Sequence, residues 1–240
     1  MSTVDQLIER TSVRRFLDQP VPDEVKNTVI DCAINAPTAG NQMFYTILDI
    51  ADPAIKARVA ELCDHQRFIA DAPWVLLFLA DCRRWFDAYQ LAGQTARAPG
   101  VGDLILACED AMIAAQNAVV AAQSLGLGSC YIGDIIENRA QVVELLGLDP
   151  WVFPISVVIF GYPTAQQLKR PKPVRFDAKY IVLRDRYRRL SPDELRQMYT
   201  DRGQDFEGFV TAVCRRKYLS DFAAEMNRSV AEYLEAYAQD

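Results

Sequence analysis

The 240-residue sequence contains a single histidine, His65, and this scarcity argues against several kinds of site. A Ser-His or Cys-His hydrolase would have to use that one residue, and a typical zinc site needs more histidines or more closely spaced cysteines. The six cysteines include no CxxC pair, and most of them lie inside apolar runs. We therefore expect reduced cysteines in a core, no disulfide framework and no metal centre.

Glycine-rich loops of the two common nucleotide-binding types are also missing. The Gly-x-Gly pairs that begin at Gly100 and Gly126 have Ile105 and Tyr131 where the fingerprint GxGxxG needs its third glycine. The P-loop patterns GxxxxGKS and GxxxxGKT do not occur either. Any bound phosphate would therefore have to be held by side chains.

The chain carries a net charge of −6 and has an isoelectric point near 5.0. Binding to a nucleic-acid backbone needs a basic face, so this balance argues against a nucleic-acid partner. Residues 1–9 lack the basic start and apolar core of a secretory signal, which favours a cytoplasmic protein. No Gly/Ser-rich linker divides the chain, and one α/β domain with excursions is the simplest organisation.

What the sequence does contain is a compact basic segment after its first expected helix. Residues 10–16 (RTSVRRF) combine guanidinium groups with two hydroxyls. These donors suit a phosphate monoester, which carries acceptor oxygens only. Alone, the segment is as readily interpreted as a solvated basic surface. A second basic loop at residues 169–175 (KRPKPVR) favours the phosphate hypothesis, because it could approach the same anion.

Hydrophobic periodicity and turn residues predict alternating helices and strands. Helices are expected at residues 2–9, 23–36, 53–62, 84–94, 103–125 and 138–146, from a cap at Ser191 and from about residue 220; strands are expected at 44–50, 74–80, 129–132 and 155–161. The segment 103–125 has the length of a membrane span, but polar side chains such as Asp110 favour a buried central helix or a dimer seam. We therefore predict no membrane partner.

Four segments resemble the nitroreductase/flavin reductase superfamily in their order and spacing. They are residues 10–16, 36–42 (APTAGNQ), 125–133 (LGLGSCYIG) and 170–175 (RPKPVR), and residues 66–73 (QRFIADAP) add a fifth. Taken singly, each is better interpreted as a turn, a helix cap or a charged loop. Together they carry a resemblance that spans residues 7–187 and is most similar to the larger, NADPH-preferring branch.

The resemblance implies an α+β fold, with a central mixed sheet flanked by helices and a long buried central helix. It implies an FMN-binding domain over residues 1–187. Residues 188–240 would form a C-terminal helical extension that packs on the same domain or on the partner subunit. It also implies an obligate homodimer with two flavins at the subunit interface.

The site residues that the resemblance implies surround FMN on three sides. Its phosphate and ribityl chain would be held by Arg10, Thr11, Ser12, Arg14, Lys172 and Arg175. Its isoalloxazine ring would be lined by Pro37, Thr38, Ala39 and Asn41 from the second subunit, with Gln66 at the polar edge. Tyr131, Ile132 and Gly133 would run past the other side, with the Gly133 backbone amide near N5, the atom that receives the hydride.

The reaction that the resemblance implies is carried by the cofactor. NADPH or NADH would reduce FMN and leave, and a nitroaromatic, a quinone or a free flavin would then take the reducing equivalents in a ping-pong cycle. Two alternatives stay open. One is another flavin reaction on the same fold, such as dehalogenation or dehydrogenation, and the other is a non-catalytic flavin-binding protein.

Two features of the chain bear on its substrates. Asp134 follows Gly133 where the branch tends to have a second glycine, so a carboxylate is expected beside the nicotinamide or acceptor. In the tail, residues 200–208 are expected to form a mobile lid, and Arg228, which has a matching place in the branch, is expected to meet the 2′-phosphate of NADPH. For Arg202 and the cations at 215–217, helix-surface charge is the simpler interpretation.

Overall fold

The computed structural model describes residues 2–238, and these fall into two compact units. The first unit runs to Arg170 and resumes at Glu225, and the second contains residues 171–224. The chain returns to the first unit because the end of its last helix buries Tyr233 and Tyr237 in a core cluster there. The division expected after residue 187 thus lies inside the second unit.

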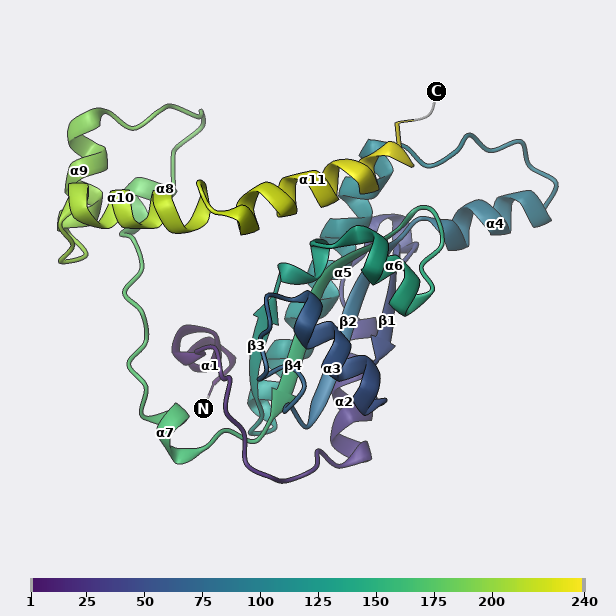
Figure 1. Ribbon diagram of the computed structural model, residues 1–240, viewed down its shortest axis with the longest axis horizontal. Helices are drawn as coiled ribbons and strands as arrows, with labels where there is room; N and C mark the ends of the chain where they lie inside the picture. The colour runs from purple at the N-terminus through teal and green to yellow at the C-terminus, as the bar shows by residue number, and fades with distance from the viewer. Residues whose placement is uncertain (1, 239–240) are drawn as a thin grey trace. The chain divides into compact units, whose positions relative to one another are not determined.

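A four-stranded sheet, in the order β1-β2-β4-β3, forms the centre of the first unit (Figure 1). The strands are β1 (Tyr45–Asp49), β2 (Trp74–Asp81), β3 (Gly128–Ile132) and β4 (Val152–Gly161). All neighbouring pairs are antiparallel, so the expectation of a mixed sheet is wrong for these strands. Apolar strands that are buried on both faces do not distinguish parallel from antiparallel pairing. An antiparallel sheet covered by helices on both sides gives the same apolar pattern as a parallel one.

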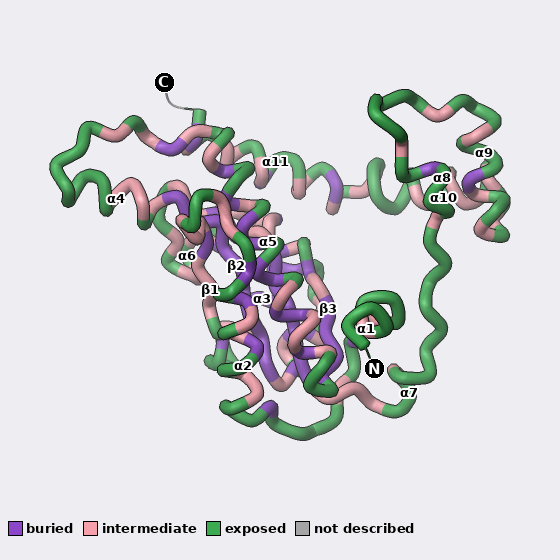
Figure 2. Tube along the Cα trace, turned by 180° about the vertical axis from the view of Figure 1, so that it is seen from behind, coloured by how far each residue is buried: buried purple, intermediate pink, exposed green. Residues whose placement is uncertain are grey.

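Helices cover both faces of this sheet and produce three layers. One face carries α2 (Asp23–Ile34) and α5 (Val101–Ser124), and the other carries α3 (Pro53–Leu62) and α6 (Arg139–Leu146). Successive side chains of β2 alternate between the layers: Leu76 and Phe78 join the α2/α5 core, whereas Val75 and Leu77 join the α3/α6 core. Figure 2 shows the central strands β2 and β4 and the inner side of α5 as largely buried.

The remaining helices of the first unit are shorter or peripheral. They are α1 (Thr3–Glu9), η1 (Ala39–Asn41), α4 (Arg83–Leu91), η2 (Asp134–Ile136), α7 (Ala165–Leu168) and the end of α11 (Asp221–Glu235). The helices and strands expected in this unit are therefore confirmed to within a few residues. Its α+β class is confirmed as well.

The long helix α5 has a buried and an exposed side. It is the only helix in the described part of the chain that is long and apolar enough to cross a membrane. Alanines such as Ala111 and Ala118 pack it against the sheet and α2, which identifies it as a core helix. Its opposite side leaves Ile105, Met112 and Ile113 exposed.

The second unit is helical and has a small aromatic centre. Its helices are α8 (Ala178–Ile181), α9 (Pro192–Thr200), α10 (Phe206–Lys217) and the first turn of α11. The cap predicted at Ser191 is confirmed, because its hydroxyl accepts from Glu194 N while the Glu194 carboxylate accepts from Ser191 N. Tyr199 packs edge-on against Phe206, with ring centroids 5.4 Å apart. Asp205 caps α10, so helix starts inside the segment expected to be a lid.

Candidate functional site

The basic segment that follows α1 lies along strand β3. Val13 N donates to Ser129 O over 2.9 Å, and Ser12 forms an isolated parallel bridge with Ser129. Gly128 makes this approach possible, because a Cβ at that position would lie 2.6 Å from a methyl carbon of Val13. Val13 is thus buried in the core, and its polar neighbours Ser12 and Arg14 lie at the edge of the sheet.

These neighbours are donors without acidic partners. Arg14 is exposed, and its guanidinium carbon lies 5.6 Å from the centre of the Phe68 ring. Arg10 Nη1 reaches only the carbonyl of Thr11, at 3.5 Å. Among the described residues, neither arginine forms an ion pair with a carboxylate. Guanidiniums without a carboxylate partner, beside half-buried Thr11 and Ser12 hydroxyls, are the donor set that a phosphate dianion requires.

Strand β3 continues from this segment into the turn at Gly133. Ile132 is buried, so only its backbone is available to a ligand. Tyr131 is half-buried, its hydroxyl donates to Gln116 Oε1 over 3.1 Å, and burial raises its pKa. Gly133 is exposed, and a Cβ built there would meet no atom within 4 Å. Open space therefore lies beside the glycine, as a flat ring passing this turn would need.

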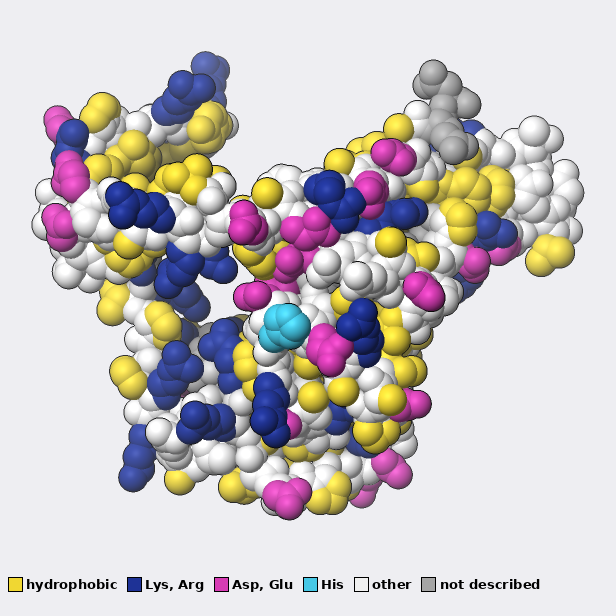
Figure 3. All heavy atoms as spheres, viewed as in Figure 1, with side chains coloured by type: hydrophobic (Ala, Val, Ile, Leu, Met, Phe, Trp, Pro, Cys, Tyr) yellow, Lys and Arg dark blue, Asp and Glu magenta, His cyan; other side chains and the backbone are white. Residues whose placement is uncertain are grey.

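Gln66 contacts the same turn through Asp134. The Gln66 side-chain amide donates from Nε2 to Oδ2 of Asp134. Its position is set by the two preceding residues, Asp64 and His65, which have φ values of 57° and 53°. Left-handed backbone is uncommon at non-glycine residues, although Asp and His adopt it more readily than most. His65 is the cyan side chain in Figure 3, where both dark blue Lys and Arg and magenta Asp and Glu side chains lie around it.

The loop that contains Pro37, Thr38, Ala39 and Asn41 is held by a buried carboxylate. Asp110 of α5 is 3% exposed, and its oxygens accept from the Thr38 hydroxyl, from Ala39 N at 2.9 Å and from Phe44 N at 3.2 Å. The Thr38 hydroxyl in turn accepts from Met43 N over 2.8 Å. The sequence pattern marks Asp110 only as a polar residue within an apolar helix, because nothing in the pattern links it to a loop 71 residues earlier.

The expected site residues of the first unit therefore form two groups. Arg10–Arg14, Gln66 and the turn 131–134 share one edge of the sheet, linked by the Arg14–Phe68 and Gln66–Asp134 contacts. Residues 37–41 are held by Asp110 of α5, and no hydrogen bond in the described chain joins them to the first group. Such a separation is what a ring site completed by a second subunit requires.

A model of the nitroreductase family matches residues 7–162 of this sequence. The chain belongs to the nitroreductase family. It is 28% identical to the FMN reductase (NAD(P)H) of Bacillus subtilis over 97% of this chain and 90% of that protein. It is 31% identical to an NADPH-dependent oxidoreductase of Staphylococcus epidermidis over 73% of this chain and 70% of that protein.

Among solved structures, B. megaterium NfrA2 is similar to this nitroreductase-family chain with a TM-score of 0.81 and 27% identity, over 95% of this chain and 98% of that one. The resemblance drawn from the sequence motifs is thereby confirmed.

Two arginines of the tail have partners within their own units. Arg228 pairs with Glu225 at 2.7 Å and with Glu232, and Arg202 lies 4.2 Å from the centre of the Phe176 ring.

These pairs bear on the expected NADPH contact. The carboxylate hydrogen bonds raise the pKa of Arg228, and a nucleotide phosphate would have to displace one of them. Arg202 stacks in the aromatic centre of the second unit, which agrees with a structural role. Lys172 and Arg175 belong to the second unit, and their convergence with Arg14 stays a prediction.

Proposed function

We propose that this chain is an FMN-dependent oxidoreductase that takes reducing equivalents from NADPH or NADH and passes them to a small-molecule acceptor. The observation that carries the proposal is the pair of guanidiniums, Arg10 and Arg14, without a carboxylate partner along strand β3, which leads into the open space at Gly133. The names of relatives, FMN reductase and NADPH-dependent oxidoreductase, support the cofactor and the electron donor.

The residues present fit FMN. Arg10, Thr11, Ser12 and Arg14 would bind its phosphate and ribityl chain, with Lys172 and Arg175 from the second unit completing the shell. Gln66 would bind the polar edge of the ring, and Tyr131, Ile132 and Gly133 would contact one side of it. FMN, when bound, supplies the hydride chemistry that no side chain here provides.

A homodimer would complete the ring site. Pro37, Thr38, Ala39 and Asn41 of a second subunit would line the face that the first subunit leaves open. The exposed apolar side of α5, with Ile105, Met112 and Ile113, supports burial against a second copy, since large apolar patches on a surface mark interfaces. This use of α5 also agrees with a cytoplasmic protein.

The protein's part in the reaction is to bind and orient. Gly133 keeps the space beside the ring clear, so that the nicotinamide and the acceptor can occupy it in turn, as a ping-pong cycle requires. Asp134 stands beside that space and is expected to influence which acceptor enters. Nitroaromatics, quinones and free flavins are the acceptor classes proposed.

The visible spectrum of the purified protein tests this function. We expect a yellow protein that bleaches when NADPH is added without oxygen, and that regains its colour with menadione. Arg14→Ala and Lys172→Ala are each expected to lower FMN occupancy, whereas Arg15→Ala, whose guanidinium contacts Gln166 at 3.4 Å, should keep it. Full occupancy in both test variants would contradict the site.

Two other outcomes point to the alternatives. Bound flavin that NADPH and NADH do not reduce would favour a non-catalytic flavin-binding protein. Flavin that is reduced but not reoxidised by any of the three acceptor classes would favour a different flavin reaction on the same fold.

A further inference from the structure

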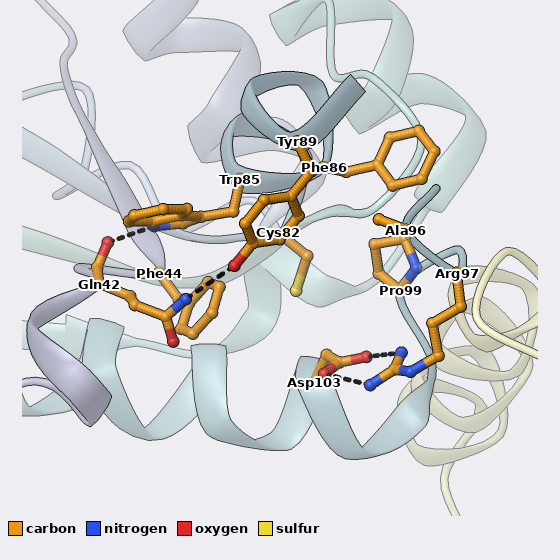
Figure 4. A pocket seen from close by; sticks show the side chains of 10 residues that line it. All are labelled: Gln42, Phe44, Cys82, Trp85, Phe86, Tyr89, Ala96, Arg97, Pro99 and Asp103. Atoms are coloured by element: carbon orange, nitrogen blue, oxygen red, sulfur yellow. Dashed lines mark hydrogen bonds and ion pairs between the residues drawn. The ribbon is translucent and has the colours of Figure 1, made fainter. Parts of the chain in front are cut away.

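A cavity lies in the first unit, and none of the residues assigned to FMN lines it. Its volume is about 340 Å³, and it opens between the end of the loop before β1, helix α4 and the segment that leads into α5 (Figure 4). The side chains of Phe44, Trp85, Phe86 and Tyr89 supply aromatic walls. Such a volume is within the range of small-molecule pockets.

The aromatic walls are held in place. Trp85 Nε1 donates to the backbone carbonyl of Gln42 over 2.6 Å, and its ring centroid lies 5.6 Å from that of Tyr89. Phe86 packs against Trp151, with centroids 4.8 Å apart. A pocket with walls fixed in this way loses little side-chain freedom when a flat ligand enters.

Its polar groups are few and specific. Gln42 Nε2 donates to the Tyr89 hydroxyl over 3.1 Å. This bond uses one amide N–H and a lone pair of the phenol, so Gln42 Oε1 is left as an acceptor, and the second amide N–H and the Tyr89 O–H as donors. These groups belong to side chains that line the cavity.

The charges at the rim cancel each other. Asp103 accepts from Arg97 Nη2 at 3.0 Å and from Gly100 N at 2.8 Å, so this carboxylate and guanidinium already satisfy one another. Cys82 also lines the cavity, and burial raises the pKa of its thiol to about 12. The cavity therefore offers neither a free charge nor a thiolate for a metal or an electrophile.

We propose that this cavity binds a neutral, planar aromatic molecule of one or two fused rings that carries a hydrogen-bonding group. The rings would stack among Trp85, Phe86 and Tyr89, and the polar group would meet Gln42 Oε1 or the Tyr89 hydroxyl. Aromatic stacking supplies most of the affinity and the amide–phenol pair sets the orientation. The proposal does not depend on the FMN site.

The probe is 2-naphthol, added to the holoenzyme and followed by isothermal titration calorimetry, with the anion 2-naphthoate as its charged counterpart. Ala96 lines the cavity from the exposed loop, so Ala96→Trp fills it without removing a core contact. Ala92→Trp, on the exposed surface of the same loop, is the matched control. Unchanged melting temperatures will establish that both variants fold.

We expect 2-naphthol to bind wild type and Ala92→Trp equally, and Ala96→Trp at least tenfold more weakly. Gln42→Leu should weaken binding severalfold, since it removes the acceptor but keeps the bulk. Binding of 2-naphthoate as tight as that of 2-naphthol would overturn the neutral-ligand claim. Equal binding by Ala96→Trp and wild type, which would locate the probe elsewhere, or no binding to wild type, would overturn the site itself.

Discussion

Gln66 and Asp134 are joined side chain to side chain, with the Gln66 amide nitrogen donating to the Asp134 carboxylate. An ionised carboxylate accepts hydrogen bonds only, so this contact decides which end of the Gln66 amide faces Asp134. The Gln66 carbonyl oxygen is consequently turned away from it and left as the acceptor for a ligand. Asp134, which stands where the branch tends to have a second glycine, thus orients Gln66, a residue expected to contact the cofactor.

Asp134→Asn is expected to weaken FMN binding about fivefold, because an asparagine can present a donor and reverse the Gln66 amide, a loss of about 1 kcal/mol. Fluorescence titration of the stripped protein with FMN measures this. Asp64→Asn, an equivalent change at an exposed left-handed position nearby, is the control and should bind FMN as wild type does. Equal affinities for all three proteins would show that Asp134 does not orient Gln66.

The sequence predicts the helices and strands that form the layers of this fold better than it predicts the directions of the strands or the contacts between distant residues. The apolar run of β2 and the periodicity of α5 are local signals, and both elements appear where they are expected. The antiparallel pairing of β2 with β4 depends on connections that span 70 residues and leave no local trace. The sequence motifs include Thr38 and Ala39. Only the structure shows that the buried Asp110 carboxylate accepts hydrogen bonds from both of them.

Asp110→Asn tests the role of that buried carboxylate. The amide nitrogen of asparagine would face one of the donors from Thr38, Ala39 or Phe44, so a buried donor would lose its acceptor. We expect a loss of about 1–3 kcal/mol in the free energy of unfolding, measured by urea denaturation. Glu109→Gln, an exposed neighbour on the same helix, should change it by less than about 0.5 kcal/mol. Equal losses in the two variants would contradict the role of Asp110.

Gly128→Ala tests the close approach of the basic segment to β3. The new methyl would lie 2.6 Å from Val13, so the segment has to move away from the strand and carry Arg10–Arg14 with it. We expect weaker FMN binding, by tenfold or more, and partial recovery when Val13→Ala is added. Gly102→Ala, where a Cβ meets no atom within 4 Å, is the control and should bind FMN normally. Normal binding by Gly128→Ala would refute the coupling.

Ser229→Ala tests how the last helix supports the site. Ser229 is fully buried; its hydroxyl donates to Ile136 O over 2.7 Å and accepts from Arg139 N over 3.0 Å. It thereby ties α11 to the segment directly after Asp134. Removing the hydroxyl leaves a half-buried N–H and a half-buried carbonyl without this partner, and we expect a loss of about 1–3 kcal/mol in unfolding free energy.

The same variant separates a structural role from a positioning role. If the tie also holds the turn at Gly133, hydrogen exchange of the backbone amides at 133–139 will accelerate in Ser229→Ala, while those of β2, in the centre of the sheet, will not. Ser124→Ala, which removes an exposed hydroxyl bonded to Ala121 O, is the control and should leave both stability and exchange unchanged. Uniform acceleration across the sheet would mean that α11 stabilises the unit as a whole without acting on this turn.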